Sequence, residues 1–203
     1  GVLEAASLGV SLCETDLAMR VNLICVEDGC IHSHSAGHIS NEEAHQLIAD
    51  LRLRFRDLGV TLVPGLSYRH VMVLPGGDPH LVCSPPHDHV GEPVRDLLVR
   101  SFDPLAEPTA DLLNRVILES QAFLRNHPVN QRRRSQDLQA ANSLWPWSPG
   151  LKPKMKTLRE RFGMSGAVIT AVDLIKGLGI YAGLDVIEVE GATGLYDTNY
   201  EGK

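Results

Sequence analysis

The sequence predicts an α/β or α+β fold, in which helices cover a mixed sheet and a βαβ unit lies near the C-terminal end. Short β-rich runs alternate along the chain with helical patterns of about 10–18 residues, which is typical of this class. Two adjacent β-rich runs, at 60–63 and 67–74, are placed to pair antiparallel. The last strand–helix–strand pattern is long enough for a right-handed crossover between parallel strands.

Local patterns support the elements of the first half. An Asp-Gly turn at 28–29 follows the first strand. Ser40 and Glu43 form a capping-box pattern ahead of the first long helix, and Gly59 ends that helix. The expected elements are a helix at 2–10, a strand at 17–26, a helix at 41–58, and strands at 60–63 and 67–74.

Proline and glycine divide the second half into ordered and irregular stretches. Apolar residues recur at helical spacing over 109–126, whereas the prolines and the glycine between 127 and 154 favour irregular structure. The expected elements are a loop at 75–93 around a short strand at 80–83, a helix at 109–126, a strand at 165–172, a helix at 173–182 and a strand at 185–190.

The composition is that of a folded globular chain. Of the 203 residues, 43% are hydrophobic and 22% are charged, which excludes a disordered tail, a coiled coil and a collagen-like fibre. No apolar run approaches the roughly 18 residues that span a bilayer, and no secretory signal opens the sequence, so we expect a cytoplasmic protein. We expect small buried cysteines in a reducing compartment, namely Cys13, Cys25, Cys30 and Cys83.

Net charge argues against two classes of partner. At −6 the chain repels nucleic acid and anionic membranes, so we expect neither as a partner. Local positive charge does occur at 132–134, where three arginines follow His127. Guanidinium groups suit phosphate and carboxylate, so this run is interpreted either as an anion site or as a solvated basic face.

Three histidines, His32, His34 and His38, lie just ahead of the first long helix. Histidine is a common metal ligand, but no acidic or cysteine companion stands here at a familiar spacing. Contact with an anion at the helix N-terminus and plain surface exposure are the other two interpretations.

Two further polar clusters follow. Strand alternation places Arg69 on one face and Tyr68 and His70 on the other. An arginine in an apolar strand needs an ion-pair partner or an anionic ligand. Next to His87, Asp88 either orients a neighbouring histidine for proton transfer or bonds its own backbone in a turn.

Other motifs are absent or ambiguous. The two tryptophans, Trp145 and Trp147, flank a proline and either close the edge of a core or hold a ligand. The sequence has no Walker A loop, no G-x-G-x-x-G and no G-x-S-x-G nucleophile motif. The residues alone therefore indicate an anion-binding α/β domain.

Taken in order, these clusters resemble the archaeal-type cofactor-independent phosphoglycerate mutases, members of the alkaline phosphatase superfamily. The resemblance runs almost from end to end and is weakest over 94–126. The matching strings are LEAASLGV at 3–10, RVNLICV at 20–26, SAGHISNEEA at 35–44, PGLSYRH at 64–70, PPHDHVGEP at 85–93, HPVN at 127–130, ANSLWPW at 141–147, AVDLIKGLGIYAGLDVIEVEGATG at 171–194 and DTNYEGK at 197–203.

The resemblance implies an enzyme of glycolysis and gluconeogenesis that interconverts 3-phosphoglycerate and 2-phosphoglycerate through a phosphoserine. In that family two divalent metals of the Mn, Mg, Zn or Co class activate the serine, and an inserted domain holds the glycerate. The first metal ligand and the serine precede a string like VLEAAS, and the other ligands follow one like DTNYEGK. The resemblance therefore implies a middle section that is inactive alone and binds no metal.

The same resemblance divides the chain into three segments. Residues 1–15 correspond to a flank of the phosphatase-like core, 16–154 to the inserted substrate-handling domain, and 155–203 to a βαβ segment that returns toward the core. The implied partners are a small phosphorylated carboxylate and the rest of the same polypeptide. Apolar edges of a βαβ unit separated from its sheet also predict self-association.

The implied substrate contacts are mainly cationic or histidine side chains. Position 38 departs from the family, which often has arginine where this chain has histidine. The nominated residues are Arg20, Arg69, Arg132, Arg133, His38, His70, His87, Asp88 and Lys203. Two other functions stay open, namely a stand-alone anion-binding module and a related metal-dependent phosphohydrolase acting on another small phosphate ester.

Overall fold

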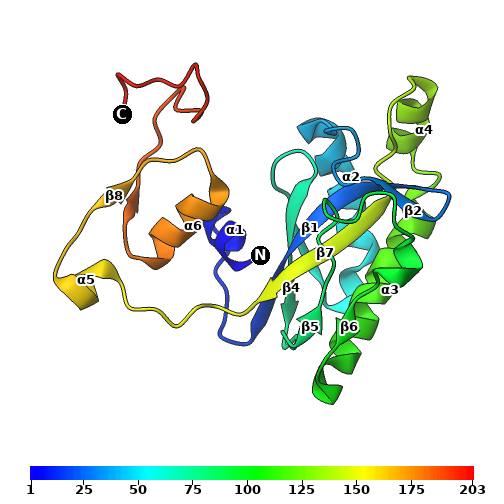
Figure 1. Ribbon diagram of the computed structural model, residues 1–203, viewed down its shortest axis with the longest axis horizontal. Coiled ribbons are helices and arrows are strands. Elements are labelled where there is room, and N and C mark those ends of the chain that lie inside the picture. Colours follow the sequence, from blue (N-terminus) through cyan, green and yellow to red (C-terminus); the bar gives the residue numbers. More distant parts are fainter. The chain divides into compact units, whose positions relative to one another are not determined.

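The computed structural model describes residues 1–203, which divide into two compact units (Figure 1). Unit 1 comprises Gly1 and Thr15–Leu151, and unit 2 comprises Val2–Glu14 and Lys152–Lys203. The divisions lie close to the expected segment boundaries at 15/16 and 154/155. The assignment of the outer segments to a phosphatase-like core stays a prediction.

Unit 1 contains a five-stranded antiparallel sheet, a two-stranded ribbon and three α-helices, whereas unit 2 contains three short helices and a pair of parallel strands. The elements of unit 1 are β1 (Asp16–Glu27), β2 (Cys30–Ser33), α2 (Asn41–Arg54), β3 (Thr61–Val63), β4 (Arg69–Pro75), β5 (Leu81–Val82), β6 (Arg100–Ser101), α3 (Glu107–Leu124), α4 (Pro128–Ser135) and β7 (Ser143–Gly150), with short 3-10 turns at Arg56–Leu58, Val94–Asp96 and Pro104–Ala106. Those of unit 2 are α1 (Val2–Ser7), α5 (Leu158–Phe162), β8 (Ala167–Val168), α6 (Asp173–Tyr181) and β9 (Asp185–Val186).

Strand β1 is the centre of the sheet. It pairs antiparallel with β4 on one side and with β7 on the other. Its last residues, 25–27, pair antiparallel with β2, and β3 pairs antiparallel with β4. In this register Arg20 lies opposite Val71 of β4 and Trp147 of β7. Asn22 lies opposite Arg69.

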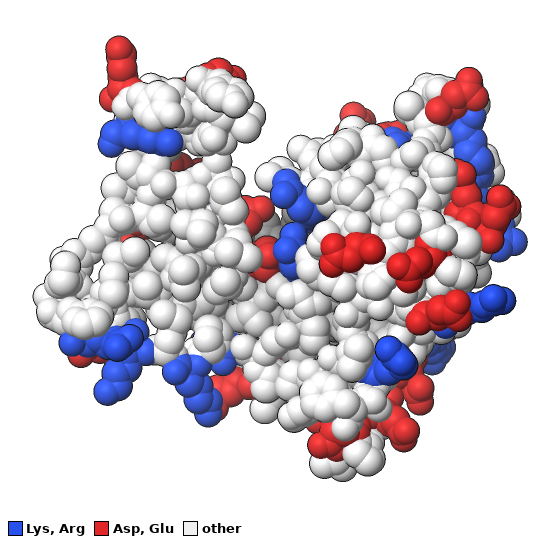
Figure 2. All heavy atoms as spheres, viewed as in Figure 1, with Lys and Arg blue, Asp and Glu red and all other residues white.

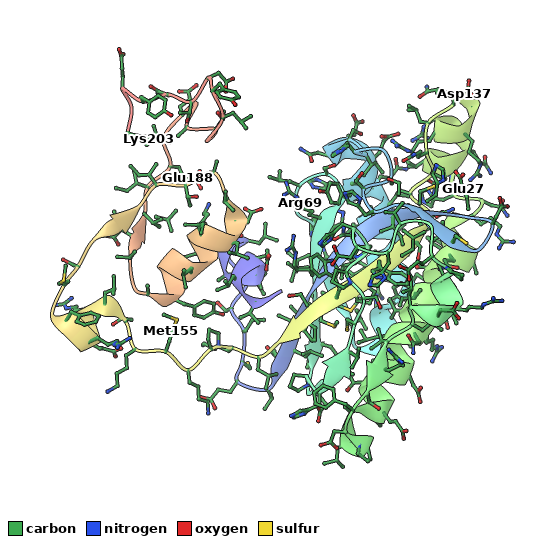
Figure 3. The ribbon with its side chains drawn as sticks, viewed as in Figure 1. Glu27, Arg69, Asp137, Met155, Glu188 and Lys203 are labelled. Carbon is green, nitrogen blue, oxygen red and sulfur yellow. The ribbon has the colours of Figure 1, made fainter.

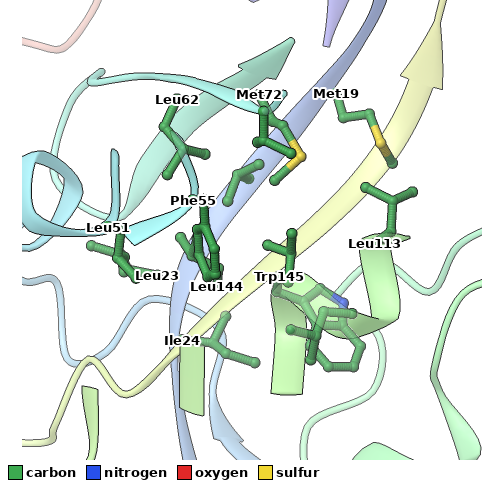
Figure 4. Close-up of a cluster of buried hydrophobic side chains, with 14 of the residues drawn as sticks. Met19, Leu23, Ile24, Leu51, Phe55, Leu62, Met72, Leu113, Leu144 and Trp145 are labelled. Carbon is green, nitrogen blue, oxygen red and sulfur yellow. The ribbon is translucent and has the colours of Figure 1, made fainter. Parts of the chain in front are cut away.

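The alternation of β1 assigns its two faces. Leu17, Met19, Val21 and Leu23 are fully buried and join one apolar core with the inward residues of α2 and α3 (Figure 4). Because successive strand side chains point to opposite faces, the polar residues between them lie on the other face. The core therefore fixes which face of the sheet carries polar chemistry.

The local stop and start signals act as expected. Asp28 and Gly29 adopt positive φ angles of 48° and 76° in the turn between β1 and β2. The Ser40 hydroxyl accepts from the Glu43 amide at 3.3 Å and caps α2. Gly59 is left-handed at φ 68° and ends the helical turn after α2.

The expectation of irregular structure over 127–154 is wrong, because this stretch contains α4 and β7. Pro128 is the first residue of α4, where its missing N–H is tolerated, and the His127 ring accepts from the Val129 amide as the cap. Strand β7 pairs with β1 alone, so Pro146 lies on an edge strand where it breaks no ladder.

Several smaller expectations also differ from the structure. Strands β2 and β6 and helix α5 were not expected. Tyr68 precedes β4 rather than lying within it, so strand alternation does not separate its ring from Arg69. All four cysteines are free, but only Cys25 is buried, and Cys13 is exposed. The prediction that all are buried is therefore wrong.

Unit 2 confirms the C-terminal βαβ pattern. Strands β8 and β9 pair in parallel, and α6 connects them, although each strand has only two ladder residues. Gly177 of α6 lies so close to the Leu3 backbone of α1 that an added Cβ would meet its carbonyl oxygen at 1.9 Å. No helix of the protein is long and apolar enough to span a membrane.

Candidate anion-binding site on the sheet face

Eight side chains of unit 1 meet around the sheet face that α2 and α3 leave uncovered. They come from β1, the loop before α2, the start of β4, the loop before α3 and β7, and they contact one another through ring stacking, cation–π contacts and hydrogen bonds. We call them the sheet-face cluster, which consists of Arg20, Asn22, His34, His38, Tyr68, Arg69, His87 and Trp147.

The two arginines of the cluster are each supported by an aromatic ring. The Arg20 guanidinium lies 4.3 Å from the centre of the Trp147 ring, and the Arg69 guanidinium lies 5.6 Å from that of Tyr68. The register of β1 and β4 makes these arginines a diagonal pair on neighbouring strands, a spacing that is within reach of long side chains. Two guanidinium groups on one face form an attractive site for an anion. Figure 3 shows Arg69 at the β4 side of this unit.

Three histidine rings contact the two aromatic rings that support the arginines. His34 lies 5.8 Å from Tyr68 and 6.3 Å from His87, measured between ring centres. His87 lies 5.3 Å from Trp147, and His38 lies 5.7 Å from Tyr68. Partial burial, followed by the charges of His87 and His38, lowers the pKa of His34. His34 is therefore a neutral hydrogen-bonding group at neutral pH.

The loop that carries Tyr68 and Arg69 is tightly held. The Gly65 amide donates to His70 Nδ1 at 3.1 Å, and the Gly65 carbonyl lies 2.9 Å from His45 Nε2. A Cβ at Gly65 would meet the Arg69 carbonyl oxygen at 2.3 Å, so only glycine fits. Ser67 donates to the Ile39 carbonyl at 2.6 Å and joins this loop to the one that carries His38.

His70 does not fit its expected role as a substrate contact. It is 3% exposed, and burial, reinforced by His45, lowers its pKa to about 3. Its Nδ1 atom accepts from Gly65, while its buried Nε2 atom has no partner. His70 therefore supports the loop beneath Arg69 and does not reach the sheet-face cluster.

Arg133 does not fit the role of an anion contact either. The residue is 3% exposed, and its guanidinium is used inside the fold. It donates to Glu43 at 2.6 Å, to the Gln139 carbonyl at 2.7 Å and to the Ala36 carbonyl at 2.8 Å. This arginine joins α4, α2 and the histidine loop, so we exclude it from the site.

The remaining nominated residues occupy three different places. Asp88 is exposed, with its carboxylate 3.6 Å from Nε2 of His87, and so borders the cluster. Arg132 of α4 is exposed and bonds Gln46 of α2 at 3.4 Å rather than a cluster residue. Lys203 belongs to unit 2, where its ammonium lies 5.5 Å from the Tyr200 ring. Roles for Arg132 and Lys203 stay predictions.

The histidine loop does not assemble a metal site. His32 turns toward Glu27 at 3.5 Å, whereas His34 and His38 face Tyr68. Among residues 1–203, no group of three or more histidine, cysteine, aspartate or glutamate side chains is arranged to hold a metal ion. The residues present therefore do not fit the divalent metals that the resemblance implies.

Four cluster members, Asn22, His34, Tyr68 and Trp147, are not among the nominated contacts, although His34 and Tyr68 belong to polar clusters that the sequence singles out. Trp147 was interpreted mainly as closing a core edge; Trp145 is buried in the core, but Trp147 is half-buried beneath Arg20. Asn22 was not considered at all. An amide two residues after an arginine in an otherwise apolar strand was the available signal, because a polar group there needs a partner.

Charge around the site is local. On the face of unit 1 visible in Figure 2, acidic and basic side chains are interspersed. The cationic character of the cluster therefore comes from its two arginines and from the histidines that carry a proton at a given pH.

Comparison with known proteins identifies the family. The model of the 2,3-bisphosphoglycerate-independent phosphoglycerate mutases matches residues 1–130. The chain belongs to this family. A mutase of Methanosarcina acetivorans is 50% identical over 203 residues, which are 99% of this chain and 49% of the relative. Mutase 2 of Methanothermobacter thermautotrophicus is 45% identical over 204 residues, covering all of this chain and 49% of the relative.

Solved structures agree with the family. A cofactor-independent phosphoglycerate mutase of Thermoplasma acidophilum aligns over 94% of this chain and 52% of its own length, with a TM-score of 0.67 and 28% identity. A protein of Pyrococcus horikoshii aligns over 100% of this chain and 46% of its own length, with a TM-score of 0.71 and 26% identity. The chain thus spans about half the length of the mutases that it matches.

Proposed function

We propose that this chain is the substrate-handling part of a phosphoglycerate mutase, and that the sheet-face cluster holds the phosphorylated glycerate. The observation that carries the proposal is the pair Arg20 and Arg69, two ring-supported guanidinium groups on one sheet face of a member of this family. Phosphoglycerate carries a phosphate and a carboxylate, and guanidinium forks bind both groups.

The cluster also offers groups for the rest of such a substrate. His34 is neutral near pH 7 and is suited to hydrogen-bond a hydroxyl, whereas His38 and His87 add positive charge when protonated. Because the chain offers no metal site, no phosphoryl-transfer step is assigned to its residues. The serine nucleophile and the divalent metals of the mutase reaction belong to the rest of the polypeptide, and this chain alone is inactive.

Unit 2 supplies the contact with the rest of the polypeptide. Several apolar side chains of α6 are 39–44% exposed. An apolar surface of this kind on a short βαβ unit is typical of a contact with another part of a protein. The exposed residues of α6 are Leu174, Ile175, Leu178 and Ile180. We assign this face to the phosphatase-like core, and self-association is its outcome when the core is absent.

Binding of 3-phosphoglycerate to the 203-residue chain tests the proposal. We expect saturable binding with a Kd of about 1 mM or tighter, and NMR shifts confined to the sheet-face cluster. Arg69→Ala removes a charge-assisted contact and should weaken binding by roughly 1.5–3 kcal/mol. Arg56→Ala, an exposed arginine after α2, is the matched control and should leave the affinity unchanged.

Two results would contradict this function. One is equal loss of affinity in Arg69→Ala and Arg56→Ala, which would indicate only non-specific attraction between an anion and positive charge. The other is no binding of 3-phosphoglycerate at all. Preference for a different small phosphate ester would move the assignment to a related phosphohydrolase.

A further inference from the structure

We propose that Asn22 is a positioning residue that sets both sides of the anion site through the two ends of its amide. The inference deepens the proposed function and rests on it for the identity of the bound anion. Asn22 is 3% exposed and does not contact solvent-borne ligands directly. Its effect on binding is therefore exerted through the groups that it orients.

The amide of Asn22 joins three segments. Its Oδ1 atom accepts from the Trp147 indole Nε1–H at 3.0 Å, and its Nδ2 atom donates to the His34 carbonyl at 3.0 Å. An indole N–H only donates and a carbonyl oxygen only accepts, so the orientation of the amide is fixed by its partners. The asparagine amide supplies both the acceptor and the donor that these two partners need.

The first hydrogen bond sets the platform for Arg20. The Trp147 ring lies 4.3 Å beneath the Arg20 guanidinium and 5.3 Å from the His87 ring. Because the indole can rotate about its side-chain bonds, the bond to Asn22 selects the rotation that places the ring under the arginine. Loss of this bond leaves the aromatic ring beneath the Arg20 guanidinium free to rotate.

The second hydrogen bond sets the histidine side of the site. Holding the His34 carbonyl fixes the backbone from which the His34 ring reaches Tyr68 at 5.8 Å and His87 at 6.3 Å. Arg69 lies directly opposite Asn22 across the β1–β4 ladder. Asn22 is therefore the cross-strand neighbour of Arg69 and lies two positions from Arg20 on the same face of β1.

Asn22→Leu tests this role, because leucine keeps the approximate volume and removes both hydrogen bonds without adding charge. Asn114→Leu is the matched control. The Asn114 amide likewise makes two hydrogen bonds, although both join backbone groups: its Oδ1 atom accepts from the Val99 amide and its Nδ2 atom donates to the Val99 carbonyl, both at 2.8 Å. Asn114 lies outside the cluster. Trp147→Phe is the second variant, which keeps an aromatic ring but loses the bonded N–H.

The readouts are the indole Nε1–H resonance of Trp147, the titration of His34 by NMR and the Kd for 3-phosphoglycerate. In Asn22→Leu we expect faster solvent exchange of the indole proton, a His34 pKa closer to that of a free histidine, and a Kd raised about tenfold or more. Trp147→Phe should reproduce the change in Kd with a smaller change at His34. Asn114→Leu should lower thermal stability and leave all three readouts unchanged.

Unchanged indole exchange and His34 titration in Asn22→Leu would overturn the positioning role, as would a Kd within about twofold of the parent chain. An Asn22→Leu chain that does not fold transfers the decision to Trp147→Phe, where an unchanged Kd overturns the role. If the parent chain binds no 3-phosphoglycerate, the proposed function fails, and the indole and His34 readouts still decide whether Asn22 organises the cluster.

Discussion

At the scale of single residues, the histidines of this protein differ because their surroundings differ. His70 is buried between the sheet and α2, and burial lowers its pKa from an ordinary value of 6.5 to about 3. His38 and His87 are exposed on the sheet-face cluster. The family resemblance nominated all three, and only the packing separates the buried support from the accessible groups.

The pKa of His70 predicts a pH dependence of stability. The unfolded chain takes up a proton at this position below about pH 6.5, whereas the folded chain does so only near pH 3. Stability from this group is therefore complete above pH 6.5 and is lost as the pH falls toward 3, by about 1.4 kcal/mol for each pH unit.

Urea unfolding between pH 7 and pH 4.5 measures this loss. His70→Asn provides the comparison, because its Oδ1 atom can accept from the Gly65 amide and does not titrate. We expect the free energy of unfolding of the parent chain to fall more steeply with decreasing pH than that of the variant. Parallel curves for the two chains would show that His70 is not the group responsible.

At the scale of elements, short sequence patterns predict the helix and turn boundaries that depend only on residues close together in the chain. Ser40, the turn at Asp28 and Gly29, and the glycine after α2 are local signals, and each marks its boundary in the fold. Strand β7 was missed because its prolines oppose a strand locally, while its pairing with β1 joins residues 119 to 132 positions apart. Pairing at such distance overrides local preference.

In the candidate site, too, some residues were predicted from the sequence and others depend on contacts between distant parts of the chain. Arg20, Arg69, His38 and His87 were nominated from the sequence and lie together on one sheet face. Arg133 was nominated from the family resemblance and from its place in the basic run at 132–134. Its partner Glu43 is 90 positions away in the sequence, so a buried structural arginine and an exposed binding arginine are indistinguishable before folding.

Arg133 is predicted to hold the histidine loop between α2 and α4. Arg133→Met keeps the aliphatic length and removes the bonds to Glu43, Gln139 and Ala36. The partly exposed Glu43 carboxylate keeps only its bond from the Ser40 hydroxyl, and the buried Ala36 carbonyl loses its donor. We expect a loss of roughly 2–4 kcal/mol in the free energy of unfolding.

Arg134→Met is the control for this variant, because Arg134 is exposed and bonds only the Arg125 carbonyl at 2.7 Å. It should cost less than about 1 kcal/mol in chemical unfolding. Equal losses of unfolding free energy in the two variants would show that Arg133 does not hold the histidine loop. Hydrogen exchange at Gly37 and His38 should rise in Arg133→Met alone, since this loop loses its anchor.

At the scale of the whole molecule, the two compact units differ in how much apolar surface they bury. Unit 1 has a continuous apolar core behind its sheet and carries the proposed anion-binding groups, whereas unit 2 exposes much of its apolar surface. The chain also spans about half the length of its mutase relatives. Composition and periodicity predicted the fold class. The different roles that we propose for the two units rest on the burial seen in each of them.

The central claim is that this chain handles substrate for a catalytic site elsewhere on the same polypeptide. The most direct test is the mass of the native polypeptide, with its reading frame sequenced beyond both ends of these 203 residues. We predict a product near twice this length, with a serine nucleophile before residue 1 and aspartate and histidine metal ligands after residue 203. A native product of 203 residues would contradict the account and leave an anion-binding module without chemistry of its own.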